Sequence, residues 1–304
     1  MISAMIIDSD AGIDDALAIL TLVGSNKFNI SLINATSGNV TQEQAYRNIR
    51  AILGLAGKKI KVSKGNESSL SGKKKRAQLV HGRDGLGNTF LAAKVDILNP
   101  LKSPEAIERS IKRENVKKIL TLGPLTNIAQ AFIKYPSLEN LLDEIWIMGG
   151  QIKVSGNTSA GGEFNFYFDP YAAEIVLSSA VKKRLITLDV TQRVLFDRSF
   201  IDSFIKKRNK IYDFIARILD FSYRFSCKKR GLKAAHLPDL VAACLFLNKR
   251  LCNFRKLKID VDKKTGCLLE KSHGWEIWLA TNLKRKEIKE MALCNLLKLG
   301  SRRR

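Results

Sequence analysis

The sequence has little histidine, proline or cysteine for its length: three His, six Pro and five Cys among 304 residues. No Cys-x-x-Cys pair occurs, so neither a disulfide framework nor a cysteine-rich zinc site is expected. An odd number of scattered cysteines is typical of reduced thiols, and we predict a cytoplasmic protein. These cysteines are Cys227, Cys244, Cys252, Cys267 and Cys294.

Long apolar runs are also absent, since none reaches the roughly 20 residues that cross a bilayer. The chain enters its first apolar segment without the basic start of a signal peptide, so we expect a soluble, non-exported protein. A hydrophobic content of 45% is enough for a large buried core, and no Pro-, Gly- or Ser-rich linker divides the chain. We predict one domain over residues 1–304, with a basic tail at 300–304.

Acidic residues are outnumbered, 29 against 52 Lys and Arg, which gives a net charge of +23. Much of this excess positive charge lies in short clusters, which either form a solvated surface or make non-specific contacts with polyanions. The sequence leaves both interpretations open. No nucleic-acid-binding module is visible, so a dedicated nucleic-acid reader is not expected. The basic clusters are Lys73-Lys74-Lys75-Arg76, Lys182-Lys183-Arg184, Lys206-Lys207-Arg208, Cys227-Lys228-Lys229-Arg230 and Arg302-Arg303-Arg304.

Four of the scarce carboxylates nevertheless crowd into one turn, at Asp8, Asp10, Asp14 and Asp15. An apolar strand-like run, 4–7, precedes them and a helix-like run, 16–23, follows. Helix capping or the helix dipole would explain one or two aspartates near a helix start, but not all four. Oxygen ligands without nearby His or Cys favour a hard divalent cation, Ca²⁺ or Mg²⁺.

Strand-like and helix-like segments alternate through the rest of the chain, which predicts an α/β fold with an open, mostly parallel, Rossmann-like central sheet flanked by helices. Two longer loops, 64–95 and 151–168, interrupt the alternation. The expected strands are 29–36, 60–63, 118–122, 144–148, 184–188, 257–261 and 275–280. The expected helices are 41–55 with Thr41 as N-cap, 104–114, one from the 123–127 turn to 135, 169–178, 197–225, one capped by Asp239 that ends at 247, and 287–299.

The aspartate turn and several later motifs, in this order, make the chain resemble the nucleoside hydrolases, the inosine-uridine preferring N-ribohydrolases. The opening motif runs from Asp8 to Ala16, with Ala11 where the family usually has proline. The later matches are Gly38-Asn39, His81 to Gly87, Gly123-Pro124-Leu125-Thr126-Asn127-Ile128-Ala129, Met148-Gly149-Gly150, Gly156-Asn157, Glu163-Phe164-Asn165, Asp169-Pro170 and Pro238-Asp239.

This resemblance implies the nucleoside hydrolase fold, a homodimer or homotetramer, a role in purine or pyrimidine salvage, and a Ca²⁺ cofactor. Its implied calcium ligands are Asp10, Asp15, the backbone carbonyl of Thr126, and Asp239. Its implied substrate contacts are Asp14, Asn39 and Asn165 on the lower ribose hydroxyls, and Asn157 and Glu163 on the 5′ side. Asp8 is expected to support the metal ligands from behind.

The implied reaction is hydrolysis of the N-glycosidic bond of a ribonucleoside to ribose and free base. Positive charge develops on the sugar in the transition state, and surrounding carboxylates stabilise it. Calcium lowers the pKa of its bound water, and Asp10 takes the proton as general base.

The acid that assists the leaving base is less clearly marked. Some family members have His directly before the last aspartate, but here Pro238 holds that position and His236 is the nearest candidate. His236 either protonates the base or packs in the core, and His81 is a candidate substrate contact. The aromatic pair Tyr223 and Phe225 fits a flap over the base or helix packing equally well. The loop 160–162, Ala-Gly-Gly, also departs from the family pattern.

Two other functions compete with this one. A haloacid dehalogenase-type phosphatase also begins with Asp-x-Asp after a strand, but it gives no role to Asp14, Asp15 or the later motifs. A weakened hydrolase-fold protein that binds polyanions through its basic clusters would fit the charge, although every expected metal ligand is retained.

Overall fold

The computed structural model describes residues 2–74, 76–92, 100–205 and 207–301, apart from the side chain of Arg230. A nine-stranded sheet crosses these residues in the order β10-β9-β11-β6-β5-β4-β1-β2-β3. Neighbouring strands are parallel except at β9, which is antiparallel to both of its neighbours. The strands are β1 (Ala4–Ser9), β2 (Asn29–Ala35), β3 (Lys61–Lys64), β4 (Lys118–Thr121), β5 (Glu144–Met148), β6 (Lys182–Ile186), β9 (Asn253–Val261), β10 (Leu268–Glu270) and β11 (Trp275–Thr281), and a separate hairpin pairs β7 (Leu195–Phe196) with β8 (Ala235–His236).

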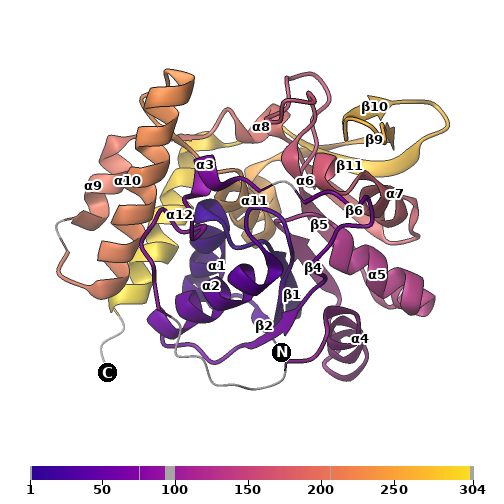
Figure 1. Cartoon of the computed structure of the whole chain (residues 1–304), viewed down its shortest axis with the longest axis horizontal. Coiled ribbons are helices and arrows are strands. Elements are labelled where there is room, and N and C mark those ends of the chain that lie inside the picture. The colour runs from indigo at the N-terminus through magenta and orange to yellow at the C-terminus, as the bar shows by residue number, and fades with distance from the viewer. Residues whose placement is uncertain (1, 75, 93–99, 206, 302–304) are drawn as a thin grey trace.

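Helices cover both faces of the sheet (Figure 1). Alternate residues of β1 face opposite ways, so Met5 and Ile7 join one apolar core while Ile6 joins the other. The first core includes side chains of α1 (Ile13–Ser25), α2 (Gln42–Leu55), α8 (Leu188–Thr191), α9 (Arg198–Ile205), α10 (Lys210–Arg230), α11 (Pro238–Leu247) and α12 (Arg285–Ser301). The second includes side chains of α4 (Ser103–Arg113), α5 (Thr126–Lys134), η1 (Pro136–Leu141), α6 (Phe164–Phe168) and α7 (Pro170–Ser178).

The strand order places a crevice at the centre of the sheet. From β1 the chain moves outward through β2 and β3, then returns to the other side of β1 and continues through β4, β5 and β6. Ligands of open α/β sheets bind where the order reverses, beyond the carboxyl ends of the two strands at that point. Here those strands are β1 and β4, so the aspartate turn after β1 faces the turn that leads into α5.

The predicted fold class is confirmed: the chain forms an α/β fold with a large, mostly parallel sheet and flanking helices. Thr41 caps α2 as predicted, since its hydroxyl accepts from the Gln44 amide. The predicted tail begins within a helix, because Gly300 and Ser301 end α12, and 302–304 lie outside the described residues.

Several predicted boundaries are wrong. The helix expected over 197–225 is two helices, α9 and α10, because the chain becomes extended at Asn209, whose side chain caps α10. Both long loops contain short helices, α3 (Gln78–His81) and α6. Strand β10 and the β7–β8 hairpin have no counterpart in the prediction. Asp239 does not cap α11: the cap position is Leu237, and Asp239 lies inside the first turn.

The basic cluster Lys182-Lys183-Arg184 is only partly a surface cluster, since Lys183 is 6% exposed and Arg184 8%. Strand β6 begins at Lys182, two residues earlier than predicted, and therefore contains both Lys183 and Arg184. The Lys183 ammonium donates to the Ser179 carbonyl at 2.6 Å, and the Arg184 guanidinium pairs with Glu144 at 2.6 Å. The strand start was predicted too late because its first residues are charged.

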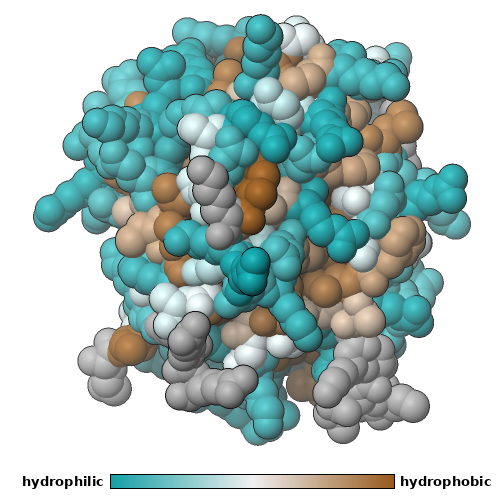
Figure 2. All heavy atoms as spheres, turned by 90° about the vertical axis from the view of Figure 1, so that its left-hand side faces the viewer, coloured by the Kyte–Doolittle hydropathy of each residue, from teal (hydrophilic) through white to brown (hydrophobic). Residues whose placement is uncertain are grey.

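Other clusters are solvated. Lys207 and Arg208 lie exposed between α9 and α10, and Lys228 and Lys229 lie exposed near the end of α10. Figure 2 shows the side of the molecule on which α9 and α10 lie as mainly hydrophilic, with scattered apolar patches. The five cysteines are all free, as predicted. Among the described helices, none is long and apolar enough to cross a membrane.

Candidate active site

The turn between β1 and α1 fixes the Asp15 carboxylate from two directions. The Ser9 hydroxyl donates to Asp15 Oδ1 at 2.6 Å, and the Gly12 amide donates to Oδ2 at 2.9 Å. Helix α1 starts at Ile13, earlier than predicted, so Asp14 and Asp15 occupy its first turn, where the helix dipole favours negative charge. Ala11 has a φ of 54°, a left-handed conformation that costs a non-glycine residue about 1 kcal/mol or more.

Asn39, in the loop between β2 and α2, holds Asp10. Its backbone amide donates to Asp10 Oδ2 at 2.6 Å and its side-chain amide to Oδ1 at 2.9 Å, while the side chain also lies 3.4 Å from Asp15 Oδ2. A Cβ atom on Gly38 would lie 2.1 Å from Asp10 Oδ2, so only glycine permits this approach. In this structure Asn39 orients the general-base candidate, and its contact with ribose stays a prediction.

Asp239 reaches the same cluster from the start of α11. Its backbone amide lies 3.4 Å from Asp14 Oδ2, and carboxylate oxygens of Asp14, Asp15 and Asp239 all lie within 4.8 Å of one another. These three side chains are buried and come from two segments more than 200 residues apart. The group could hold a metal ion, and it includes Asp14, which the family resemblance implies is a ribose contact.

The turn between β4 and α5 supplies further polar residues at the carboxyl edge of the sheet. Thr126 begins α5 and is buried, and its hydroxyl donates to Asp169 Oδ2 at 2.6 Å. The next side chain, Asn127, donates to Asp8 Oδ1 at 2.8 Å. Asn127 therefore holds one oxygen of Asp8, and a supporting role of Asp8 behind the metal ligands stays a prediction. Neither Asn127 nor Asp169 had a role in the sequence prediction, although both lie in the motifs that carried the resemblance.

Glu163 directly precedes α6 and Asn165 lies on it, within the loop predicted to bind the sugar. Glu163 caps this helix: its Oε2 accepts from the amides of Gly150 at 2.8 Å and Asn165 at 3.0 Å. The Asn165 side chain donates to the Leu122 carbonyl at 2.7 Å, beside β4. Asn157 is exposed, and its side chain accepts from the Phe164 amide at 2.8 Å.

The two candidate histidines have different surroundings. His81, at the end of α3, accepts from the Ile13 amide through Nδ1 at 3.1 Å, and the same nitrogen lies 3.8 Å from Asp14 Oδ1. Because Nδ1 accepts, its neutral ring carries the proton on Nε2. His236 is half-buried in β8 and pairs with Leu195 of β7. Tyr223 and Phe225 lie on α10.

Burial and mutual repulsion perturb the carboxylates. Burial, with a smaller contribution from Asp15, raises the pKa of Asp14 to about 7, and burial likewise raises that of Asp8 to about 7. The pKa values of Asp10 and Asp239 lie well above the usual range, because burial and neighbouring carboxylates disfavour their ionised forms. Several buried like charges need protons or a cation to balance them. The residues therefore fit a hard divalent cation.

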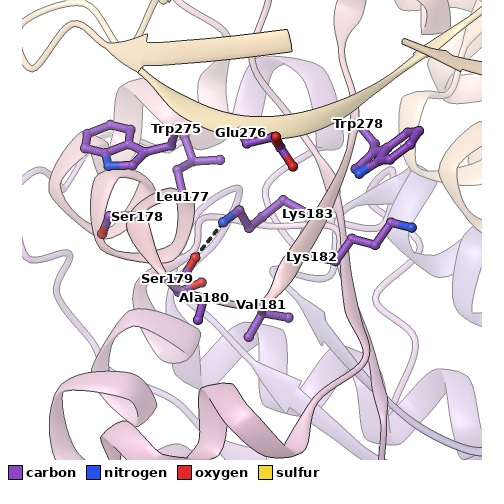
Figure 3. Close-up of a pocket in the computed structure, with 10 residues that line it drawn as sticks. All are labelled: Leu177, Ser178, Ser179, Ala180, Val181, Lys182, Lys183, Trp275, Glu276 and Trp278. Carbon is purple, nitrogen blue, oxygen red and sulfur yellow. Dashed lines mark hydrogen bonds between the residues drawn. The ribbon is translucent and has the colours of Figure 1, made fainter. Parts of the chain in front are cut away.

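A cavity of about 420 Å³ lies elsewhere, at the amino end of β6. Figure 3 shows Trp275 and Trp278 above it and Lys183 pointing toward Ser179. It contains none of the predicted site residues and belongs to the opposite end of the parallel strands.

Comparison with known proteins decides the family. The model of the inosine-uridine preferring nucleoside hydrolases matches residues 5–289. The chain belongs to this family. This nucleoside hydrolase is 31% identical to a probable uridine nucleosidase 2 of Arabidopsis thaliana, over 77% of its own chain and 74% of that protein. It is 34% identical to the pyrimidine-specific ribonucleoside hydrolase RihA of Photobacterium profundum, over 77% and 76%.

Solved structures agree with this assignment. A plant nucleoside hydrolase, PpNRh1, superimposes with a TM-score of 0.92 at 25% identity, over 99% of this chain and all of that one. A purine-preferring ribonucleoside hydrolase from Gardnerella vaginalis gives a TM-score of 0.91 at 25% identity, over 98% and 99%. The enzyme is an N-ribohydrolase that acts on ribonucleosides, and the phosphatase alternative is wrong.

Proposed function

We propose that the enzyme hydrolyses ribonucleosides in a calcium-dependent reaction at the carboxyl edge of β1 and β4. The observation that carries the proposal is the buried carboxylate cluster, whose oxygens on Asp14, Asp15 and Asp239 lie within 4.8 Å of one another. The proposed ligands are Asp10, Asp15, Asp239 and the Thr126 carbonyl. An all-oxygen set of this kind suits calcium, which when bound would lower the pKa of the attacking water.

Asp10 is the proposed general base, and the structure supports that role through Asn39. Two hydrogen bonds from Asn39 fix both oxygens of the Asp10 carboxylate, so the group is oriented before substrate arrives. The abstracted proton would come from water and be held on Asp10. As the glycosidic bond breaks, positive charge on the sugar would be stabilised by the surrounding carboxylates.

The proposed sugar contacts lie around this edge. Asp14, Asn39 and Asn165 would bind the lower hydroxyls, while Glu163 and Asn157 would bind the 5′ side. His81 is fixed against the first turn of α1, 3.8 Å from Asp14, which supports a role beside the substrate. For the leaving base we keep His236 as the proposed acid, because it lies three residues before Asp239 on the same segment.

We propose uridine and related pyrimidine ribonucleosides as the first substrates to test, since relatives above 30% identity are named for uridine or pyrimidine ribonucleosides. The metabolic role would then be nucleoside salvage in the cytoplasm. A homodimer or homotetramer is proposed from the family resemblance, and light scattering of the purified protein tests it.

A nucleoside panel tests the whole proposal. Uridine, cytidine, inosine and adenosine are incubated with the enzyme in calcium-containing buffer, and released ribose is measured as reducing sugar. We expect turnover of uridine, loss of activity in EGTA and recovery when calcium is restored. No turnover of any nucleoside by folded protein would overturn the activity of this chain. Turnover that EGTA leaves unchanged would overturn only the calcium dependence.

His236→Ala sharpens the role of the leaving-group acid. A general acid contributes about 10²- to 10⁴-fold, so kcat should fall by at least about 100-fold for the base that depends on it, while KM changes little. An unchanged kcat for every nucleoside would show that His236 only packs.

A further inference from the structure

The segment 66–73 lies along the junction of α6 and α7, far from it in sequence. The Leu70 amide donates to Asp169 Oδ2 at 2.7 Å, and the Ser71 hydroxyl donates to the Phe168 carbonyl at 2.7 Å. The Lys73 ammonium donates to the Tyr167 carbonyl at 2.6 Å and lies 3.9 Å from the centre of the Tyr167 ring. Leu70, Ser71 and Lys73 therefore contact Asp169, Phe168 and Tyr167 in turn, so the two stretches run in opposite directions.

Asp169 does more than cap a helix. One oxygen, Oδ1, accepts from the Ala172 amide at 3.2 Å, which is the capping bond of α7. The other oxygen accepts from two donors outside that helix, the Thr126 hydroxyl at 2.6 Å and the Leu70 amide at 2.7 Å. The side chain is fully buried, so losing either bond would leave a polar group without water.

A second bridge runs in parallel through the next residue of α5. The Asn127 side chain donates to Asp8 Oδ1 at 2.8 Å and accepts from the Asn66 amide at 3.2 Å. A Cβ atom on Gly65, the residue just before the segment, would lie 2.3 Å from Asn127 Oδ1, so the backbone there packs directly against this side chain. Thr126 and Asn127 thus each connect the segment to the carboxylate edge.

Beyond this segment, His81 contacts the other half of the site. Its ring accepts from the Ile13 amide at the start of α1, next to Asp14. Residues 66, 70 and 81 therefore meet the carboxylate edge at Asn127, Asp169 and Ile13. Asn127 and Asp169 each bond both the segment and a residue of the site, Asp8 and Thr126 respectively.

We propose that Asp169 is a positioning residue that couples the segment 66–73 to the metal site through Thr126. It holds the Thr126 side chain, and with it the peptide whose carbonyl is a proposed ligand, while its other acceptor bond docks Leu70. The inference rests on the proposed function, because it assigns Thr126 to calcium. Residues behind metal ligands typically change affinity by about 10- to 100-fold when they are replaced.

Two substitutions remove the bond between Asp169 and Thr126. One keeps the capping bond of α7, and the other keeps the Thr126 carbonyl. Asn is as good an N-cap as Asp, so Asp169→Asn retains the acceptor for Ala172 but puts an amide where Oδ2 accepted two bonds. Thr126→Val removes the hydroxyl and keeps the backbone carbonyl. The matched control is Thr265→Val, which removes a hydroxyl that donates to Asp262 at 2.8 Å in the turn between β9 and β10.

The readouts are calcium affinity by titration calorimetry and amide hydrogen exchange over residues 66–73. We expect Asp169→Asn and Thr126→Val to weaken calcium binding by about 10-fold or more. Exchange in the segment should rise in Asp169→Asn, and calcium should slow it in the unmodified protein. Ser71→Ala removes the bond to the Phe168 carbonyl and the 3.0 Å contact with the Ser69 hydroxyl, but it leaves the bonds of Asp169 in place. It should raise exchange with calcium affinity changed less than about twofold.

The outcomes distinguish two failures. If the unmodified protein turns over no nucleoside and binds no calcium, the proposed function fails and takes this inference with it. If the unmodified protein binds calcium, and both variants bind it with the affinity of the Thr265→Val control, the inference alone fails. Should Asp169→Asn not fold, Thr126→Val measured against Thr265→Val decides the coupling by itself.

Discussion

The two ends of the parallel strands both contain buried charge, but they balance it differently. At the amino end, Glu144 of β5 lies between two cations, with Arg184 at 2.6 Å and Lys118 at 3.2 Å. Burial alone would raise the pKa of Glu144, but the hydrogen bond from Arg184 and the positive charges of Arg184 and Lys118, acting with the other hydrogen bonding at this carboxylate, more than reverse this, and the pKa is lowered. The Arg184 guanidinium also lies 4.5 Å from the centre of the Phe254 ring.

At the carboxyl end the buried side chains all carry the same type of charge, because they are all aspartates. Asp8, Asp10, Asp14, Asp15 and Asp239 are each at most 8% exposed, and amides, the Ser9 hydroxyl and His81 are among their close partners. Burial raises pKa values here, to about 7 for Asp8 and Asp14. A buried charge that the protein neutralises itself supports the fold, whereas one left for a ligand to neutralise marks a site.

The largest expected effect comes from the carboxyl end. Asp10→Ala removes the proposed general base and one ligand, so kcat for uridine should fall by about 10³-fold or more, measured as released ribose. Asp143→Asn, a change at an exposed carboxylate, is the control and should leave kcat unchanged. Activity within tenfold of the unmodified enzyme would contradict the role of Asp10.

At the amino end the same kind of change should affect stability instead. Glu144→Gln leaves the buried Arg184 without its partner, so the free energy of unfolding should fall by about 3 kcal/mol in urea titrations. Because the pair is far from the carboxyl edge, kcat of the folded fraction should not change. Adding Arg184→Met should recover part of the loss. A fall in kcat without loss of stability would show that the two ends are not separate.

The pH dependence of stability in the metal-free enzyme tests the carboxylates at the carboxyl end without reference to turnover. Folded Asp8 and Asp14 keep their protons up to about pH 7, whereas the unfolded chain releases them near 3.8. Their contribution is therefore most favourable below about pH 4 and is lost as the pH rises to 7. Urea unfolding at pH 5 and 7 in EGTA measures it. Saturating calcium should reduce the loss, and an equal loss with calcium would argue against a metal at this cluster.

The smallest effect is expected on the surface. Lys228→Glu combined with Lys229→Glu reverses two exposed charges on α10 and should leave kcat/KM unchanged, because solvent screens both groups. Elution from heparin at lower salt would show non-specific polyanion contact through this cluster. A change in uridine turnover would instead link the basic surface to the site.

The sequence by itself determined the family and most of the elements. Alternation of apolar runs gave the parallel sheet, because strand and helix periods differ, and the Asp8 to Ala16 motif with its successors gave the nucleoside hydrolases. Prediction from the sequence was less reliable where residue type suggests exposure but tertiary contacts bury the side chain. Lys183 and Arg184 look like surface residues and are buried, since Arg184 finds its counter-charge on Glu144 of a neighbouring strand.

Only the tertiary structure decided how the aspartates are held. Asp14 and Asp239 are more than 200 residues apart and meet because α1 and α11 both start at the carboxyl edge of the sheet. Asn39 clamps Asp10, and Asp169 joins Thr126 to the segment 66–73, through hydrogen bonds between loops that no local pattern encodes. The physical reason is that motif spacing identifies the residue types, whereas strand order determines which of them become neighbours.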